Sequence, residues 1–166
     1  MNQHLERIGL LAPFLQPCVT RLIERVKREL GVPLLVTNGF RSIDEQRLIY
    51  QQGRTFNPAS QEWEVTDQKQ VKTNAKPGRS AHNVVDGRDI PAALAVDVIP
   101  LNADGTINWA PPEALWTAIY KIAWACGLDP LGDAVGAYYK PDKGHLEEPQ
   151  WKLKLSGFGY KLPSVV

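Results

Sequence analysis

Cysteine is scarce in this chain of 166 residues, which contains only Cys18 and Cys126. Two thiols are too few for the disulfide framework that holds many small secreted domains together. Each cysteine lies in a segment whose apolar residues follow a helical spacing, so we expect both to be buried free thiols. Zinc binding by Cys126 is the alternative interpretation.

A surplus of charge of either sign is also missing. The 19 Lys and Arg residues nearly balance the 18 Asp and Glu residues, and the formal net charge is +1. Such a chain has no general electrostatic attraction to nucleic acid or to an anionic membrane. It also lacks the basic and aromatic pattern of nucleic-acid-binding domains. We therefore expect no nucleic-acid partner.

Long hydrophobic runs are absent as well. The apolar run near the N-terminus, residues 8–15, is too short to cross a membrane, and no clear small-residue cleavage site follows it. We expect a protein without a membrane span that is synthesised in the cytoplasm without a signal peptide.

The residues that are present fit one globular domain over residues 1–166, with 43% hydrophobic and 22% charged residues. Apolar spacing predicts an amphipathic N-terminal helix over 15–30 and then a short strand over 33–37. Ser42 and Glu45 form a capping box, which predicts the start of a second helix. The short connection between this strand and this helix is a place where side chains often face a cleft.

The middle of the chain is less regular. Residues 54–79 are polar and aperiodic, and we expect them to form a flap loop beside the active site. Residues 93–101 are the best candidate for a central strand, and residues 144–147 predict a short strand. Helices and strands that do not alternate regularly indicate an α+β fold.

The C-terminal third contains one more predicted helix, which begins after Pro112 and ends at Gly127. We expect three aromatic residues of this helix to pack in the core: Trp116, Tyr120 and Trp124. The tail, residues 151–166, is expected to pack on the surface.

Two of the three histidines can each be paired with a carboxylate further along or shortly before them in the chain. His145 follows Asp142 by three residues, and Asp97, which interrupts an apolar strand, lies fifteen residues after His82. A carboxylate inside an apolar strand needs a partner. Imidazole nitrogens and carboxylate oxygens are the ligands of catalytic zinc, which takes three protein ligands and keeps a fourth position open. His82, Asp97 and His145 therefore form a candidate zinc site, and hydrogen-bonded structural histidines are the alternative.

Four motifs stand in an order that resembles a known family. They are Gly39-Phe40-Arg41-Ser42 with Gln46, Gly78-Arg79-Ser80-Ala81-His82, Ala93-Leu94-Ala95-Val96-Asp97 and Asp142-Lys143-Gly144-His145. Their order is similar to that in the zinc peptidoglycan peptidases, which comprise D-alanyl-D-alanine carboxypeptidases and L-alanyl-D-glutamate endopeptidases and include phage endolysins. The resemblance spans about residues 39–147, the expected catalytic core. It implies a small central antiparallel sheet flanked by helices, like that of hedgehog and the D-alanyl-D-alanine peptidases.

The resemblance also implies a role for each motif residue. The two histidines and the aspartate would bind one zinc ion, and Asp142 would act as the general base. Arg41 would hold the substrate carbonyl oxygen as it gains negative charge. Ser80 would hydrogen-bond the substrate near the metal. The simpler alternatives are a solvated loop carboxylate for Asp142, a surface ion pair for Arg41 and an ordinary turn residue for Ser80.

The choice of the aspartate ligand is open to one alternative. The family usually places its aspartate seven residues after the histidine, where this chain has Asp89. We prefer Asp97, because it has the apolar strand context and the flanking residues of the family motif, whereas Asp89 lies in a segment typical of a turn. An insertion over residues 84–92 accounts for the longer spacing.

These observations lead to a hypothesis of function. We expect a monomeric zinc metallopeptidase that hydrolyses the stem peptide of bacterial peptidoglycan, most simply an L-alanyl-D-glutamate endopeptidase of the endolysin type that acts on the bacterial cell wall after its release. A D-alanyl-D-alanine carboxypeptidase or dipeptidase is the alternative within the same class. A zinc-containing binding module on the same fold, without catalysis, is the alternative from a different class.

Overall fold

The computed structural model describes residues 3–130 and 143–164, and its fold is α+β, as predicted. Its main sheet contains β1 (Leu34–Asn38), β5 (Ala95–Pro100), β7 (His145–Glu147) and β6 (Asp129–Pro130), in the order β1-β5-β7-β6. All three neighbouring pairs are antiparallel. The prediction of a small antiparallel sheet flanked by helices is therefore confirmed, with the expected central strand at β5.

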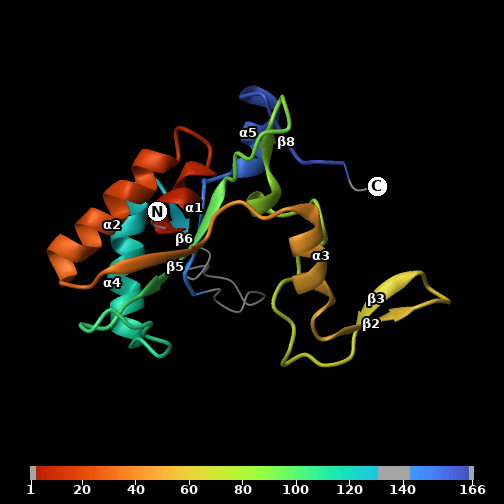
Figure 1. Ribbon diagram of the computed structural model, residues 1–166, viewed down its shortest axis with the longest axis horizontal. Coiled ribbons are helices and arrows are strands. Elements are labelled where there is room, and N and C mark those ends of the chain that lie inside the picture. Colours follow the sequence, from red (N-terminus) through yellow and green to blue (C-terminus); the bar gives the residue numbers. More distant parts are fainter. Residues whose placement is uncertain (1–2, 131–142, 165–166) are drawn as a thin grey trace.

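Two helices, α2 (Gln16–Leu30) and α4 (Glu113–Ala125), pack side by side against this sheet (Figure 1). Both were predicted from their apolar spacing, and the buried residues follow that spacing. They bury a continuous set of side chains: Val19, Leu22, Val26, Trp116, Ile119, Tyr120 and Ala123. The prediction for Trp124 is wrong, because 49% of this residue is exposed at the margin of the buried stripe.

A short helix that the sequence analysis did not anticipate, α1 (Gln3–Gly9), covers the edge strand β1. The backbone N–H of Val36 donates to Nδ1 of His4 at 3.1 Å, and Nη1 of Arg7 donates to the Val36 carbonyl at 2.7 Å. Both polar backbone groups of Val36 are thereby satisfied at an edge that would otherwise be open. His4, the third histidine, thus contributes to the packing of α1 on the sheet.

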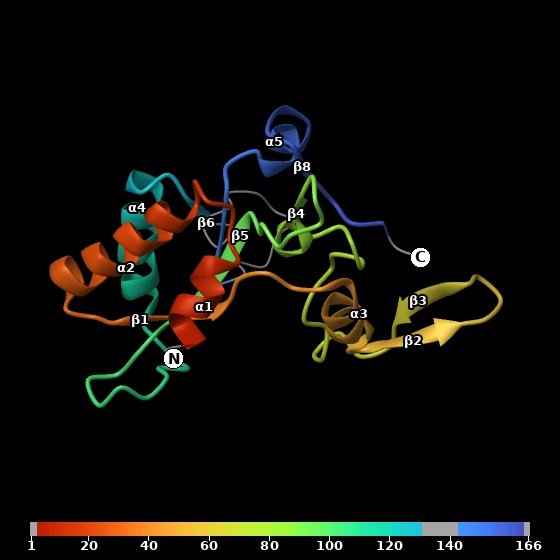
Figure 2. The same ribbon diagram turned by 45° about the horizontal axis from the view of Figure 1, so that its top comes forward.

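The segment 54–79 is more ordered than predicted. It begins with an antiparallel hairpin of β2 (Arg54–Asn57) and β3 (Glu62–Val65), which lies beside α3 (Ile43–Gln51) at the periphery of the molecule in both views (Figures 1 and 2). The expectation of a structureless loop is wrong over these residues. The two strands are only four residues long and rich in polar residues, so they show no clear strand pattern in the sequence. Asn57 closes the turn by accepting a hydrogen bond from the backbone N–H of Ala59 at 2.9 Å.

The tail and the expected insertion pair with each other. β4 (Val85–Asp86) forms a two-stranded antiparallel sheet with β8 (Tyr160–Lys161), which follows helix α5 (Trp151–Gly157). The tail therefore packs on the surface as expected, but it contains a helix that was not predicted. None of the helices in the described part of the chain has the length and apolarity that a membrane span requires. Cys18 and Cys126 are free thiols; Cys126 is buried, as predicted, whereas Cys18 is only partly buried.

Candidate metal centre

Two of the candidate ligands face each other across neighbouring strands. Asp97 on β5 stands directly opposite His145 on β7 in the antiparallel register. The strands approach closely at this point, because the backbone N–H of Val98 donates to the Gly144 carbonyl at 2.9 Å. Gly144 has a φ of +93°, and a Cβ atom there would lie 2.3 Å from the Val98 carbonyl oxygen. Only glycine fits this approach, which brings His145 beside Asp97.

The third candidate ligand comes from a different kind of element. His82 lies in a short 3-10 helix, η1 (Ala81–Asn83), which begins after Ser80. A reciprocal capping box fixes this turn: the Ser80 hydroxyl accepts from the His82 N–H, and the Asn83 carboxamide oxygen accepts from the Ser80 N–H. The backbone N–H of Arg41 also donates to the His82 carbonyl at 2.9 Å. His82 is buried, with 2% of its surface exposed.

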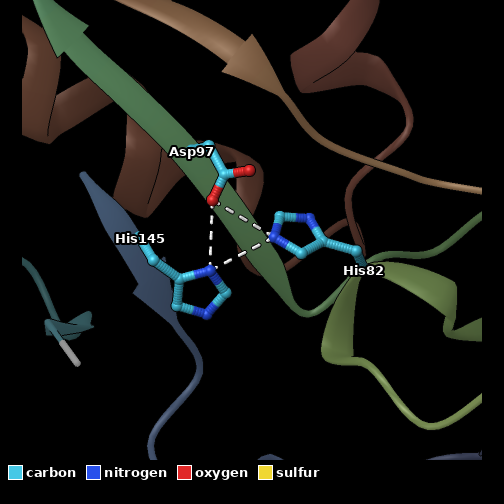
Figure 3. A group of neighbouring side chains, drawn as sticks. All are labelled: His82, Asp97 and His145. Carbon is cyan, nitrogen blue, oxygen red and sulfur yellow. Dashed lines mark hydrogen bonds and ion pairs between the residues drawn. The ribbon is translucent and has the colours of Figure 1, made fainter. Parts of the chain in front are cut away.

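The three side chains meet at one point (Figure 3). Nε2 of His82 lies 3.2 Å from Oδ1 of Asp97 and 3.2 Å from Nδ1 of His145, and the third side of the triangle, from Nδ1 of His145 to Oδ1 of Asp97, is 3.1 Å. Within residues 3–130 and 143–164, no other three His, Cys, Asp or Glu side chains converge in this way. The structure thus brings together the ligands that the sequence predicted.

Hydrogen bonds on the far sides of both imidazole rings determine which nitrogens face inward. Nδ1 of His82 lies 2.6 Å from the Gly39 carbonyl oxygen, which can only accept, so this nitrogen carries the proton. Nε2 of His145 lies 3.3 Å from Oε2 of Glu147 and donates to that carboxylate. The inward nitrogens of both rings therefore present lone pairs. Together with the carboxylate oxygen of Asp97, three lone-pair donors face one another, an arrangement that needs a proton or a cation between them.

Electrostatics at this point favour positive charge. When protons instead of a cation occupy the inward nitrogens, burial raises the pKa of Asp97, but the charge of His82 and hydrogen bonds from both histidines hold it well below its usual range. Burial lowers the pKa of His145, but hydrogen bonds with Asp97 and Glu147, together with their charges, raise it to about 10. The ionised carboxylate and the protonated imidazole together show that the site stabilises positive charge, which a bound metal ion would supply in place of the proton.

The donor set fits a zinc ion. Ligand atoms at about 2.0–2.1 Å from a tetrahedral zinc are themselves roughly 3.3–3.4 Å apart, close to the 3.1–3.2 Å observed here. Two nitrogen donors and one oxygen donor exclude a typical calcium or magnesium site, which consists of oxygen ligands. The same donor set also occurs at non-haem iron centres, so the donors alone do not choose between zinc and iron.

Arg41 lies at the corner between β1 and α3, as predicted, and contacts the centre. Its Nη2 is 3.3 Å from Oδ2 of Asp97, and its Nη1 donates to the Gln46 carboxamide oxygen at 2.9 Å. Gln46, which is completely buried, donates in turn to the Ala75 carbonyl at 2.8 Å. Asp97 therefore directs Oδ1 toward the histidines and Oδ2 toward the guanidinium, which also fixes the rotation of the carboxylate.

The other predicted site residues have different placements. Ser80 is buried beside His82, where its hydroxyl acts as a helix cap. Asp142 lies outside the described residues. Asp89 is remote from the histidines: it lies in a turn with a φ of +65°, its side chain is 70% exposed, and it pairs with Lys161 at 2.9 Å. The structure thus places Asp97, and not Asp89, in the centre.

The sequence analysis missed three groups that hold the ligands. They are the Gly39 carbonyl, the Glu147 carboxylate and the Asn83 carboxamide, which donates to the Arg41 carbonyl at 2.7 Å. Glu147 and Asn83 each lie within two residues of a predicted ligand, and a search for polar neighbours of the ligands could have found them. The Gly39 carbonyl has no side-chain signal, because any residue has a carbonyl group.

The model of the D-alanyl-D-alanine carboxypeptidase family VanY matches residues 11–103, which is more than half of the chain. The chain belongs to this family. The matched VanY segment begins ahead of α2, ends three residues after β5 and includes His82 and Asp97. His145 lies beyond it, and its place in the centre follows from the pairing of β7 with β5.

A curated relative supports the same family. The chain is 29% identical over 110 residues to the peptidoglycan L-alanyl-D-glutamate endopeptidase CwlK of Bacillus subtilis (strain 168). The match covers 62% of this chain and 54% of CwlK, so the chain spans about half the length of this relative.

Solved structures of peptidases have the same fold. The L-Ala D-Glu endopeptidase ChiX of Serratia marcescens superposes with a TM-score of 0.52 at 19% identity, over 87% of this chain and 85% of ChiX. A mutant of the vancomycin resistance D,D-pentapeptidase VanY, solved in complex with Zn(II), superposes with a TM-score of 0.55 at 16% identity, over 90% of this chain and 79% of that one. At these identities the likeness concerns the fold.

Proposed function

We propose that this protein is a zinc peptidase that hydrolyses the stem peptide of bacterial peptidoglycan, at the bond between L-alanine and D-glutamate. The observation that carries the proposal is the triangle of inward lone pairs on His82, Asp97 and His145, with both imidazole rings anchored on their far sides. The match to the VanY family supports peptide hydrolysis over oxidation, and the Zn(II) complex of a VanY structure with the same fold supports zinc over iron.

Each group in the centre has a task in hydrolysis. A zinc ion held by the three side chains would supply an activated water and polarise the substrate carbonyl. Asp142, three residues before His145, takes the proton from the attacking water and passes it to the departing amine. Arg41 hydrogen-bonds the carbonyl oxygen as negative charge develops on it. A guanidinium has five N–H donors, and the contacts with Asp97 and Gln46 occupy two of them.

The choice of bond rests on the similarity to CwlK, which is an L-alanyl-D-glutamate endopeptidase. The second candidate function is a D-alanyl-D-alanine carboxypeptidase, which the description of the matching family favours. These two activities differ in one structural requirement, because a carboxypeptidase must bind a free terminal carboxylate. A zinc-containing binding module without catalysis is the third candidate, but such a module has no use for a base at Asp142.

Mass spectrometry of digested muropeptides tests the proposal. We expect the protein with one equivalent of zinc to separate L-alanine from D-glutamate, to lose this activity in EDTA and to regain it when zinc, but not Fe(II), is added. Release of terminal D-alanine with the L-alanyl-D-glutamate bond intact would establish the carboxypeptidase instead.

The role of the base and the lytic role need a second assay. We expect the wild-type protein to clear a suspension of outer-membrane-permeabilised cells and the Asp142→Ala variant to leave it turbid. Equal clearing by both proteins would refute the general-base role. No clearing by the wild type, with muropeptide hydrolysis intact, would contradict the endolysin-type action that the sequence led us to expect.

A further inference from the structure

A small pocket lies between α3 and the hairpin. Its volume is about 180 Å³, below the roughly 300–1,000 Å³ of pockets that enclose drug-sized ligands. It can therefore take a single ring or side chain. Its walls come from α3, from β3 and from the segment that follows the hairpin: Arg47, Tyr50, Glu62, Trp63, Lys76 and Pro77. We call it the α3 pocket.

The α3 pocket shares two walls with the candidate metal centre. On α3, Gln46 accepts a hydrogen bond from Arg41, whereas the next residue, Arg47, lines the pocket. In the segment after the hairpin, Ala75 accepts from Gln46, whereas the next residue, Lys76, lines the pocket. The pocket therefore shares α3 and the segment after the hairpin with the residues that hold Arg41 in place.

The pocket is preformed. The guanidinium of Arg54 lies 4.1 Å from the centre of the Tyr50 ring, donates to the Tyr50 carbonyl and donates to Asn74 Oδ1 at 3.1 Å. At the foot of the hairpin, Gly53 has a φ of +73°, and a Cβ atom there would lie 2.4 Å from the Asp67 carbonyl oxygen. These contacts join α3, the hairpin and the following segment, so a ligand does not bear the cost of ordering them.

The polar groups of the pocket suit a neutral ligand. Nζ of Lys76 lies 3.4 Å from Oε1 of Glu62, and Arg47 pairs with Asp44. An ionic ligand would compete with charges that are already paired. A ligand with hydroxyl and amide groups, in contrast, can hydrogen-bond the charged groups as they stand. Trp63, which is only partly buried, supplies a flat apolar surface for the face of a ring, whereas Tyr50 is buried beneath the Arg54 guanidinium. This combination of surfaces fits a sugar.

We propose that the α3 pocket is a subsite for a sugar of the peptidoglycan glycan strand. This inference rests on the proposed function. The first residue of the stem peptide, L-alanine, is joined to the lactyl group of N-acetylmuramic acid, so the bond between L-alanine and D-glutamate lies one residue from the glycan. The terminal D-alanine lies several residues further away. A sugar subsite on the element that also anchors Arg41 is therefore useful to an L-alanyl-D-glutamate endopeptidase and of little use to a carboxypeptidase.

Binding of a disaccharide without peptide tests the subsite independently of hydrolysis. The probe is N-acetylglucosaminyl-N-acetylmuramic acid whose lactyl carboxyl group is amidated, as it is in the substrate, so that the probe is neutral; it is titrated into the zinc-loaded protein and followed by NMR. We expect the Trp63→Ala variant to bind it about tenfold more weakly than the wild type, the worth of one aromatic contact. Trp63→Phe, which keeps a ring partner for Phe56, should lie between them. The matched control is Trp109→Ala, because Trp109 is 79% exposed and does not line the pocket.

Kinetics give a second readout. We expect the wild type and the Trp109→Ala variant to prefer a disaccharide-linked stem peptide over the free peptide about tenfold in kcat/KM, and Trp63→Ala to lose this preference. A wild type that binds no disaccharide, or variants at Trp63 with an unchanged preference, would overturn the subsite. Hydrolysis without disaccharide binding refutes the subsite alone, whereas Trp63-dependent binding without hydrolysis of any stem peptide supports the subsite and refutes the proposed function.

Discussion

The two halves of the candidate metal centre are held by different means. Asp97 and His145 face each other on paired strands, and backbone hydrogen bonds together with the close approach at Gly144 fix their separation. His82 lies on a single turn that is held by the Ser80 and Asn83 side chains and by the main chain of residues 39–41. We call these the strand half and the turn half.

The difference lies in what each half needs from the sequence. Backbone pairing is available to any residue that fits a strand, so the strand half needs only the right ligands at the right register. The turn half depends on particular polar side chains, each completing a buried hydrogen bond. Substitutions around the ligands should therefore affect the stability of the turn half more than that of the strand half, whereas substitutions of the ligands should abolish metal binding from either half.

The largest effect is expected at a ligand of the strand half. Asp97→Ala should reduce muropeptide hydrolysis by at least roughly a thousandfold, because a metal ion supplies several kcal/mol of transition-state stabilisation. The zinc content of the purified protein should fall from one equivalent to none. The matched control is Asp89→Ala, which removes an exposed carboxylate paired with Lys161 and should leave both quantities unchanged. Zinc retention in Asp97→Ala with loss in Asp89→Ala would reverse the assignment.

A large loss of stability is expected in the turn half. Asn83 is completely buried and bonds both the Arg41 carbonyl and the Ser80 N–H. Asn83→Ala leaves one buried and one partly buried backbone group without these partners, at a cost of about 3 kcal/mol in the free energy of unfolding. Urea denaturation in EDTA measures this. Asn108→Ala, which removes one local bond to Ala110, should cost less than about 1 kcal/mol. Equal losses of unfolding free energy in Asn83→Ala and Asn108→Ala would show that the turn around His82 is held by its backbone alone.

A smaller effect is expected when the orienting partner in the strand half is changed. Glu147→Gln keeps an oxygen beside Nε2 of His145 but removes its charge, and zinc affinity should fall about tenfold. Competition with a chelator measures the dissociation constant. Glu113→Gln is the control, since this side chain is 70% exposed and pairs with Lys143. An unchanged affinity in Glu147→Gln would mean that β7 orients His145 without help.

The smallest effect is expected at Ser80, where two interpretations can be separated. As a cap of η1, Ser80→Ala should lower the free energy of unfolding by about 1 kcal/mol and leave KM unchanged. As a substrate contact, which the family resemblance implies, the same change should raise KM with little effect on unfolding. Thermal unfolding and steady-state kinetics on the same preparations distinguish the two results.

Much of the strand half could be predicted from sequence. Asp97 breaks an apolar run and His145 follows a short strand pattern, so the element and the residue type are both visible locally. The direct opposition of Asp97 and His145 was not predicted, because it depends on the register of two strands 48 residues apart in the chain. The choice of Asp97 over Asp89 needed only the contrast between a strand and a turn.

Less of the turn half could be predicted. The corner at Arg41 and the capping box of Ser42 and Glu45 were visible, and the structure confirms both. The bonds from Gly39 and Asn83 were not, since they join segments that are more than 40 residues apart and involve backbone carbonyls. The hairpin was missed for a different reason. Its two strands are only four residues long and rich in polar side chains, so their alternation of polar and apolar residues is too short to identify a strand among the neighbouring turn residues.

Two hydrogen bonds join the start of α3 to the segment around His82, and they have a consequence for how this fold can vary. The main chains of Arg41 and His82 are bonded directly, and Gln46 is bonded to Ala75. The chain between Gln46 and Ala75 therefore leaves the centre and returns to it at fixed points. Such an excursion can be shortened, lengthened or exchanged with little cost, because closure entropy grows slowly with length. The hairpin can in this sense change in length without moving the two points at which the chain meets the centre.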